Sequence, residues 1–225
     1  MLLVWGRKFA GHAAGVHGHY AATKFFHIYW LPIIPLGFVW VTGHDDDMIQ
    51  GHPIRPCWRS VVSGYLRAYG LFFGGGNLVI GLALGNWLEA LGGAGGLLVV
   101  IASYLWRHAP RSELRERELF EAAVGTYCDP ELLTADMVRS LRARLDAVWQ
   151  QKWPLDSPQD LARRGVSEPA QLPGAYAMLR LAARDADRRK ARELRELAAA
   201  LVAREGARKV EFGDGPYRKS QFGAL

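Results

Sequence analysis

Cysteine is scarce in this sequence, and the sequence motifs of several large enzyme classes are missing. Two cysteines among 225 residues, Cys57 and Cys128, cannot form a disulfide framework or a zinc site made of four thiolates. The chain also lacks the nucleophile elbow Gly-x-Ser-x-Gly, a phosphate-binding loop, the dinucleotide glycine fingerprint and the zinc motif His-Glu-x-x-His. No catalytic residue can be assigned, and we expect a protein that is not an enzyme and has no cofactor.

Charge is scarce only in the first half of the chain. Residues 1–106 contain 6 basic and 4 acidic side chains, whereas residues 107–225 contain 22 and 18. In the second half the two signs alternate, as in Arg115-Glu116-Arg117-Glu118, which is typical of a solvated helix surface. A nucleic-acid-binding protein would carry a stripe of one sign, so we expect no nucleic-acid partner.

The least charged stretch is long enough to cross a membrane twice. Residues 68–106 contain a single charged side chain, Glu89. A spanning helix needs about 20 mostly apolar residues to cross about 30 Å of hydrocarbon. Residues 68–88 and 90–106 supply two such runs, with residues 86–89 as the expected turn. Few soluble domains of this size could cover two helices that are apolar on every side. The pattern predicts a transmembrane helical hairpin whose partner is the lipid bilayer.

Basic residues predict the orientation of this hairpin. Arg55, Arg59 and Arg67 precede it and Arg107 and Arg111 follow it, whereas the turn has no basic residue. Cytoplasmic flanks carry the excess of Lys and Arg in membrane proteins. We therefore expect a multi-pass protein of the cytoplasmic (inner) membrane with both termini in the cytoplasm. Residues 1–5 are too short an apolar run for a cleavable signal peptide.

Glycine is unusually dense in the same stretch and recurs at small-xxx-small spacing. In lipid such faces let helix backbones approach closely. They indicate either packing within the hairpin or the interface of a homo-oligomer. Asn77 is the one strongly polar side chain deep in the first helix, and we expect it to bond the partner helix rather than line a pore. A pore or transport subunit is an alternative function that rests on these features alone. The candidate packing residues are Gly70, Gly74, Gly81, Gly85, Gly92, Gly96 and Asn77.

The N-terminal residues predict short β-strands at Leu2–Trp5, Phe25–Trp30 and Phe38–Thr42. Pro32 and Pro35 lie between the last two. Proline removes an amide donor and restricts the residue before it, so a continuous helix across residues 25–42 is disfavoured. A strand, a turn over residues 31–37 and a second strand fit better.

The stretch FFHIYWLPIIPLG at residues 25–37 resembles the central hairpin of the small bacterial zinc-ribbon domains, which are often attached to membrane segments. The opening VWGRK at residues 4–8 is similar to their first strand. The resemblance covers about the first 45 residues and implies a zinc-ribbon-like β module. Those domains carry two Cys-x-x-Cys knuckles, and this sequence has neither, so we expect the fold without its metal.

Histidines lie where the two knuckles would fall. His12, His17 and His19 precede the hairpin, and His44, His52 and Cys57 follow it. Neutral imidazole binds zinc well, and two ligands from each side would complete a tetrahedral site. The competing interpretation is a set of solvent-facing or hydrogen-bonding histidines. The neighbouring acidic run, Asp45-Asp46-Asp47, is interpreted as a solvated turn. A metal-responsive membrane protein is the alternative function that a zinc site would imply. Its candidate ligands are His17, His19, His44 and His52.

Beyond residue 107 the pattern is helical and polar. Helices are expected over Ser112–Val124, after Thr134, after Ser157 and over Ala175–Glu205, the last either solvent-exposed or broken within Arg184–Arg195. The fold class is mixed and mainly α. It comprises the zinc-ribbon-like β module (1–62), the transmembrane hairpin (63–107), a cytoplasmic helical bundle (108–208) and a flexible tail (209–225). The expected function is an integral membrane scaffold or adaptor that binds unidentified protein partners through its cytoplasmic helices.

Overall fold

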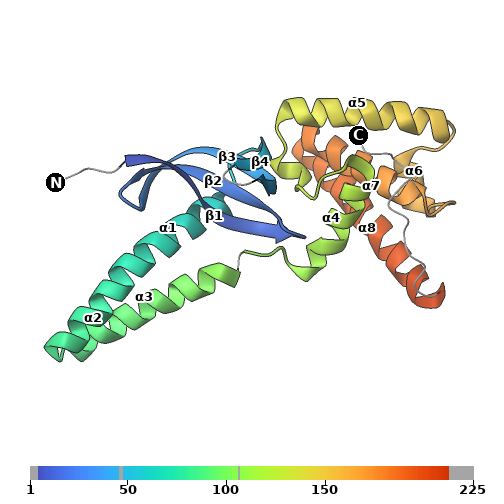
Figure 1. Ribbon diagram of the computed structural model, residues 1–225. Helices are drawn as coiled ribbons and strands as arrows, with labels where there is room; N and C mark the ends of the chain where they lie inside the picture. Colours follow the sequence, from blue (N-terminus) through green and yellow to red (C-terminus); the bar gives the residue numbers. More distant parts are fainter. Residues whose placement is uncertain (1–4, 46–47, 106, 213–225) are drawn as a thin grey trace. The chain divides into compact units, whose positions relative to one another are not determined.

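The computed structural model describes residues 5–45, 48–105 and 107–212 and divides the chain into two compact units, residues 1–110 and 111–225 (Figure 1). Unit 1 combines a four-stranded antiparallel sheet with a helical hairpin, and unit 2 is helical. The prediction of a mixed, mainly α fold is confirmed. Residues 2–4, 46, 47, 106 and 213–225, which carry parts of the sequence predictions, lie outside the described residues.

The sheet is an antiparallel meander in the order β1-β2-β3-β4. Its turn between β2 and β3 is Tyr29-Trp30, so the expected turn over residues 31–37 is wrong. Pro32 and Pro35 lie inside β3, opposite His27 and Phe25, and the pairing register shifts beside both of them. Such irregularities accommodate residues that cannot donate to the ladder. The strands are β1 (Trp5–Val16), β2 (His19–Ile28), β3 (Leu31–Asp45) and β4 (Met48–Pro53).

The sheet packs on helix α1 (Trp58–Tyr69), which begins inside the range expected for the β module. Gly11 of β1 has φ +71°, and a Cβ there would lie 1.8 Å from the carbonyl oxygen of Ser60. Only glycine fits this approach of strand to helix. The Thr23 hydroxyl donates to the Ser60 hydroxyl at 2.8 Å in the buried interface. Phe25 and Trp40 are fully buried and form the centre of this core.

The helical hairpin follows directly. Helix α1 continues through a single π-helical turn, η1 (Gly70–Gly74), into α2 (Gly75–Leu84), and α3 (Trp87–Leu105) returns beside it. Gly85 ends α2 with φ +68°, the left-handed conformation that commonly closes helices. The Asn86 side chain then accepts a hydrogen bond from the Leu88 amide at 3.2 Å. The turn is therefore shorter than the expected residues 86–89, because α3 already begins at Trp87.

Unit 2 is arranged around α7, which contacts α4, α5, α6 and α8 and is buried along most of its length. The Thr134 hydroxyl caps α5, and the chain breaks between α7 and α8, where the Asp187 carboxylate accepts from the Lys190 amide at 2.9 Å. The long pattern over Ala175–Glu205 is thus broken, and α8 continues past the expected start of the tail at residue 209. The elements are α4 (Arg111–Val124), the 3-10 turn η2 (Pro130–Leu132), α5 (Ala135–Lys152), α6 (Pro158–Arg164), α7 (Gln171–Asp185) and α8 (Arg188–Phe212).

Candidate functional site

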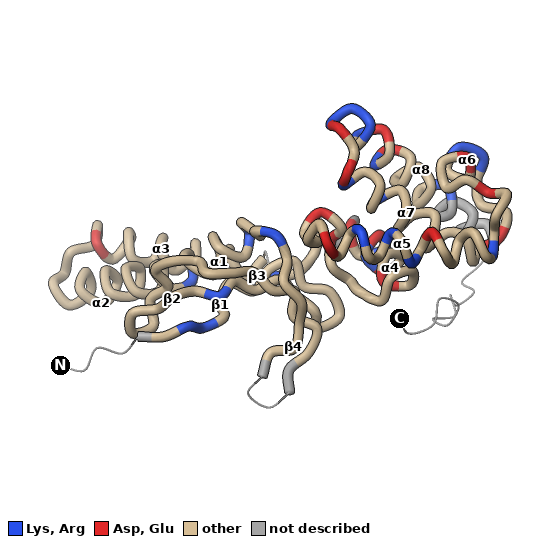
Figure 2. The backbone as a smooth tube through the Cα atoms, turned by 90° about the horizontal axis from the view of Figure 1, so that it is seen from above, with Lys and Arg blue, Asp and Glu red and all other residues tan. Residues whose placement is uncertain are grey.

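The hairpin presents an apolar surface that the rest of unit 1 leaves uncovered. Two helices, Trp58–Leu84 and Trp87–Leu105, are long and apolar enough to cross a membrane, and only 11% of the most apolar stretch of each is buried. Figure 2 shows the hairpin almost without charged residues, whereas both signs alternate along the helices of unit 2. Soluble monomers rarely expose apolar patches of this extent. The exposed side chains include Leu71, Val79, Leu82, Leu84, Leu98 and Ile101.

The two arms of the hairpin meet through glycine. A Cβ added at Gly93 would lie 2.2 Å from the Leu78 amide nitrogen, and one added at Gly96 would lie 2.9 Å from the Gly74 Cα. A Cβ added at Gly81 would lie 2.3 Å from the Ala90 amide nitrogen. Backbone-to-backbone contact of this kind gives helices dispersion contacts that lipid cannot supply.

The structure separates the candidate glycines into two groups. Gly70, Gly74, Gly81 and Gly96 face the partner arm, whereas Gly85 lies in the turn and Gly92 has no atom within 4 Å of an added Cβ. Sequence reasoning missed Gly93, which replaces Gly92 at the contact. The doublets Gly92-Gly93 and Gly95-Gly96 signal close packing, but they do not reveal which member of each pair faces inward.

Asn77 does not make the expected bond to the partner helix. Its side chain is exposed, and it has no hydrogen bond to any residue in the described ranges. An amide group exposed in hydrocarbon is costly because nothing there satisfies its donors and acceptor. Asn77 is therefore the one polar site on an otherwise apolar α2 surface.

Arg67 closes the open end of the hairpin. Its guanidinium donates to the Ser103 hydroxyl at 3.3 Å and to the Ser103 carbonyl at 3.0 Å, both in α3. It also donates to the His12 carbonyl of β1 at 3.3 Å and lies 4.3 Å from the centre of the Tyr104 ring. One side chain thus joins α1, α3 and the sheet, a role that the sequence pattern, which indicated only orientation, did not predict.

The candidate metal ligands lie in or beside the sheet. His17 is in the β1–β2 turn, His19 begins β2 and His52 lies in β4, while the side chain of His44 is outside the described part. Burial lowers the pKa of His52, and the nearby His19 lowers it further. Among the described residues, no three His, Cys, Asp or Glu side chains are placed to hold a metal ion together.

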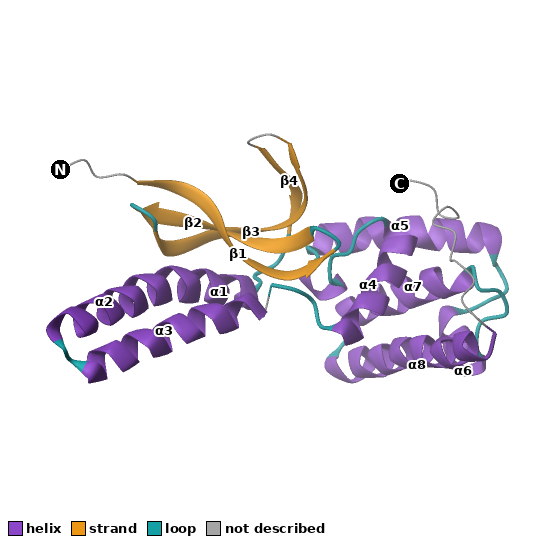
Figure 3. Ribbon diagram, turned by 60° about the horizontal axis from the view of Figure 1, so that its bottom comes forward, coloured by secondary structure: helices purple, strands orange, loops and turns teal. Residues whose placement is uncertain are grey.

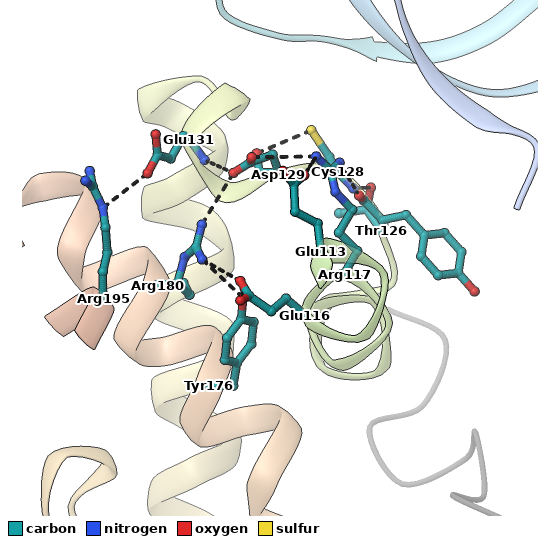
Figure 4. Close-up of polar contacts among 11 residues, drawn as sticks. Glu113, Glu116, Arg117, Thr126, Cys128, Asp129, Glu131, Tyr176, Arg180 and Arg195 are labelled. Atoms are coloured by element: carbon teal, nitrogen blue, oxygen red, sulfur yellow. Dashed lines mark hydrogen bonds and ion pairs between the residues drawn. The ribbon is translucent and has the colours of Figure 1, made fainter. Parts of the chain in front are cut away.

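Unit 2 contains a network of charged side chains between α4, the loop before η2 and α7 (Figure 4). The Arg180 guanidinium lies 2.9 Å from the Glu116 carboxylate and 3.6 Å from that of Asp129. Tyr176 donates to Glu116 at 2.8 Å. The Arg117 side chain, only 6% exposed, pairs with Glu113 at 3.1 Å and with Asp129 at 3.7 Å.

The electrostatics of this network are those of a structural brace. Burial raises the pKa of Tyr176, so its hydroxyl stays protonated and keeps donating to Glu116. Burial alone would lower the pKa of Arg180, but interactions with the Tyr176, Asp129 and Glu116 side chains outweigh it and raise the pKa. Arg117 and Arg180 are both matched by carboxylates, as buried charges must be. Cys128 beside the network is buried, and its thiol donates to the Asp129 carbonyl at 3.6 Å.

Comparisons of the chain with models of protein families, with curated proteins and with solved structures found no match. Functional interpretation therefore depends on the geometry of the molecule alone. Two features stand out in that geometry: an exposed apolar hairpin in unit 1, and a charged helical surface braced by internal ion pairs in unit 2.

Proposed function

We propose that the protein is an integral membrane scaffold or adaptor, anchored in the cytoplasmic membrane by the α1–α3 hairpin. The observation that carries this proposal is the pair of long apolar helices, because only 11% of the most apolar stretch of each is buried. Fully burying one Leu, Val or Ile side chain is worth about 1.5–3 kcal/mol, so transfer of this surface from water to lipid is strongly favourable.

The position of charge along the hairpin supports a topology. Arg59, Arg67 and Arg107 lie at its open end, and the turn at Gly85-Asn86 has no basic neighbour. The positive-inside rule then places the open end, the sheet and unit 2 on the cytoplasmic side. The sheet is, in this proposal, a zinc-ribbon-like module that keeps its fold without metal.

Unit 2 supplies the binding surface of the adaptor. Arg117 and Arg180 are engaged in internal ion pairs, while the outer faces of its helices carry alternating charges that can bind protein partners. Self-association in the bilayer is part of the proposal, because an exposed Asn77 amide in hydrocarbon is best satisfied by a polar group of another helix.

Cysteine labelling of intact cells tests the anchor. Glu89 lies exposed near the turn and Arg139 lies exposed on α5, so Glu89→Cys and Arg139→Cys report the two sides. We expect a membrane-impermeant maleimide to label Glu89→Cys in intact cells and Arg139→Cys only after permeabilisation. Recovery of the whole chain in the soluble fraction, or the reverse labelling pattern, overturns the proposal.

The adaptor role has its own test. A photo-crosslinking residue placed at Arg139, on the exposed surface of α5, should capture a defined protein in stoichiometric yield from living cells. The same residue placed at Val79, on the lipid-facing surface, serves as the matched control and should not capture that protein. If position 139 yields no specific adduct, the adaptor role fails while the anchor stands.

A further inference from the structure

The tip of the β2–β3 hairpin is an exposed apolar surface, separate from the apolar surface of the α1–α3 helical hairpin. This tip, residues 29–36, has the sequence YWLPIIPL and no charged residue. Its large side chains are substantially exposed even though the tip belongs to a folded sheet. They are Tyr29, Trp30, Ile33, Ile34 and Leu36, between 38% and 55% exposed.

The tip is fixed to the hairpin by specific contacts. The Tyr65 hydroxyl donates to the Ile33 carbonyl at 2.8 Å, and the Tyr69 hydroxyl donates to the Pro32 carbonyl at 3.1 Å. The Trp30 ring meets the Phe72 ring edge-on, with centroids 5.3 Å apart. Figure 3 shows the sheet lying along α1, so the tip reaches well past the start of the apolar helices.

The geometry of the α1–α2 helix gives the depth of the tip in the bilayer. A helix rises about 1.5 Å per residue, so a crossing of about 30 Å that ends at Leu84 must begin near Tyr65. Phe72 then lies about 10 Å below the start of the crossing. Because Tyr65, Tyr69 and Phe72 hold the tip, the tip lies in the cytoplasmic leaflet, between the start of the crossing and about 10 Å below it.

We propose that the β2–β3 tip is a third membrane-contacting element, which inserts beside the hairpin into the headgroup and upper acyl layer of the cytoplasmic leaflet. This inference rests on the proposed function, since it requires the hairpin to be in lipid. Tryptophan and tyrosine favour that layer, and Ile33, Ile34 and Leu36 supply the apolar surface that the acyl region solvates.

The backbone of the tip suits a site with little water. Pro32 and Pro35 have no amide proton to satisfy, and the tyrosine hydroxyls of α1 satisfy the carbonyls of Pro32 and Ile33. Non-helical backbone in a membrane is tolerated where its polar groups are paired within the protein. The tip therefore reaches the bilayer with fewer unsatisfied groups than an ordinary hairpin turn.

Charge on the sheet complements an anionic leaflet. Residues 1–44 contain three Lys or Arg and no Asp or Glu. Arg7 and Lys8 are exposed on β1 and pair with Phe26 and Phe25, about 10 Å back from the turn at about 3.3 Å per residue. With the tip at its inferred depth, both cations lie at headgroup level, where anionic lipid attracts them.

Spin-label depth measurements on the full chain test the inference. Labels at Ile34→Cys in the tip, Val79→Cys on the hairpin and Gln50→Cys on exposed β4 are compared, in a background with Cys57 and Cys128 replaced by alanine. The protein is reconstituted in vesicles of phosphatidylcholine and phosphatidylglycerol. We expect collisions of the Ile34 label with oxygen, relative to those with a water-soluble nickel chelate, to exceed the Gln50 value several-fold.

Each outcome has a distinct meaning. A tip label that matches Gln50 while Val79 reports lipid overturns the inference and leaves the anchor intact. A Val79 label that reports water removes the proposed function and the inference together. Dipolar broadening confined to a water-exposed Ile34 label would show that the tip binds a second copy of the chain, which also overturns the inference.

Discussion

Gly93 of α3 lies against the backbone of Leu78 in α2, so closely that a methyl group at position 93 would approach the Leu78 amide nitrogen to 2.2 Å. Backbone atoms cannot yield as a flexible side chain can. The separation of the two arms is therefore set by the absence of a side chain at this position. Gly92, its neighbour in sequence, has open space around it and provides a matched control.

Replacement of Gly93 by alanine should weaken the hairpin. Overpacking of a tight contact typically costs about 1–3 kcal/mol, and we expect Gly93→Ala to lower the free energy of unfolding by that amount. Gly92→Ala should leave it unchanged or raise it by up to about 1 kcal/mol, because alanine is the better helix former. Denaturant titration in detergent, followed by circular dichroism, measures both. Equal effects of the two variants would contradict the observed packing.

Replacement of Arg67 by lysine should destabilise unit 1. Arg67 uses two nitrogens, because Nη2 donates to the Ser103 and His12 carbonyls while Nε donates to the Ser103 hydroxyl. The single nitrogen of an ammonium group cannot reproduce this planar arrangement, and each hydrogen bond from a charged group contributes about 1.5–3 kcal/mol. We expect Arg67→Lys to lower the thermal midpoint and to accelerate amide exchange in β1. Arg59→Lys, at an exposed position in the first turn of α1, is the control. Unchanged exchange in β1 would show that the guanidinium does not hold the sheet.

The stability of unit 2 should fall at alkaline pH. The pKa of Tyr176 is raised by burial above its ordinary value near 10, so the folded state holds the proton more tightly than the unfolded state. The stabilisation is complete below pH 10 and is lost as pH rises from there toward the folded pKa. Denaturant midpoints measured between pH 8 and about 11 should decline, and the decline should be shallower in Tyr176→Phe. An identical slope in the variant would contradict the assignment.

The stability of unit 1 should fall at acidic pH. Burial and the nearby His19 lower the pKa of His52, so the unfolded chain takes up a proton near pH 6.5 before the folded chain does. Stability contributed by neutral His52 is complete above pH 6.5 and is lost as pH falls below it. We expect His52→Gln to reduce the acid sensitivity of unit 1, and His108→Gln, at an exposed position, to leave it unchanged. Nuclear magnetic resonance titration of the imidazole provides an independent measure.

Local signals in the sequence were sufficient to predict most helices of unit 2 and the existence of the helical hairpin. Helices α5 and α6 begin directly after Thr134 and Ser157 as expected, because a cap depends on residues a few positions away. The uncharged run similarly requires no knowledge of the rest of the fold. Asn77 was misjudged because its expected bond depended on which face of α2 meets α3.

The predictions for unit 1 were wrong where the structure depends on contacts between segments distant in the sequence. The turn at Tyr29-Trp30 uses Tyr29 at φ +57°, a conformation that an aromatic residue rarely adopts and that sequence patterns do not suggest. Prolines read as turn residues instead lie within β3, at register shifts defined by β2. The contact between Trp30 and Phe72, which fixes the tip, joins residues that no local pattern connects.

The π turn at Gly70–Gly74 sets the angular position of α2 about its own axis, and so the face of α2 that meets α3. It holds one residue more than an α-helical turn, so all of α2 is rotated relative to the helix that α1 alone would continue. Winding the same residues as a regular α-helix would turn Gly81 by about 100° away from Ala90, whereas deleting one residue from the turn would restore a regular helix and leave Gly81 facing Ala90. The extra residue of this turn therefore decides which side chains of α2 meet α3.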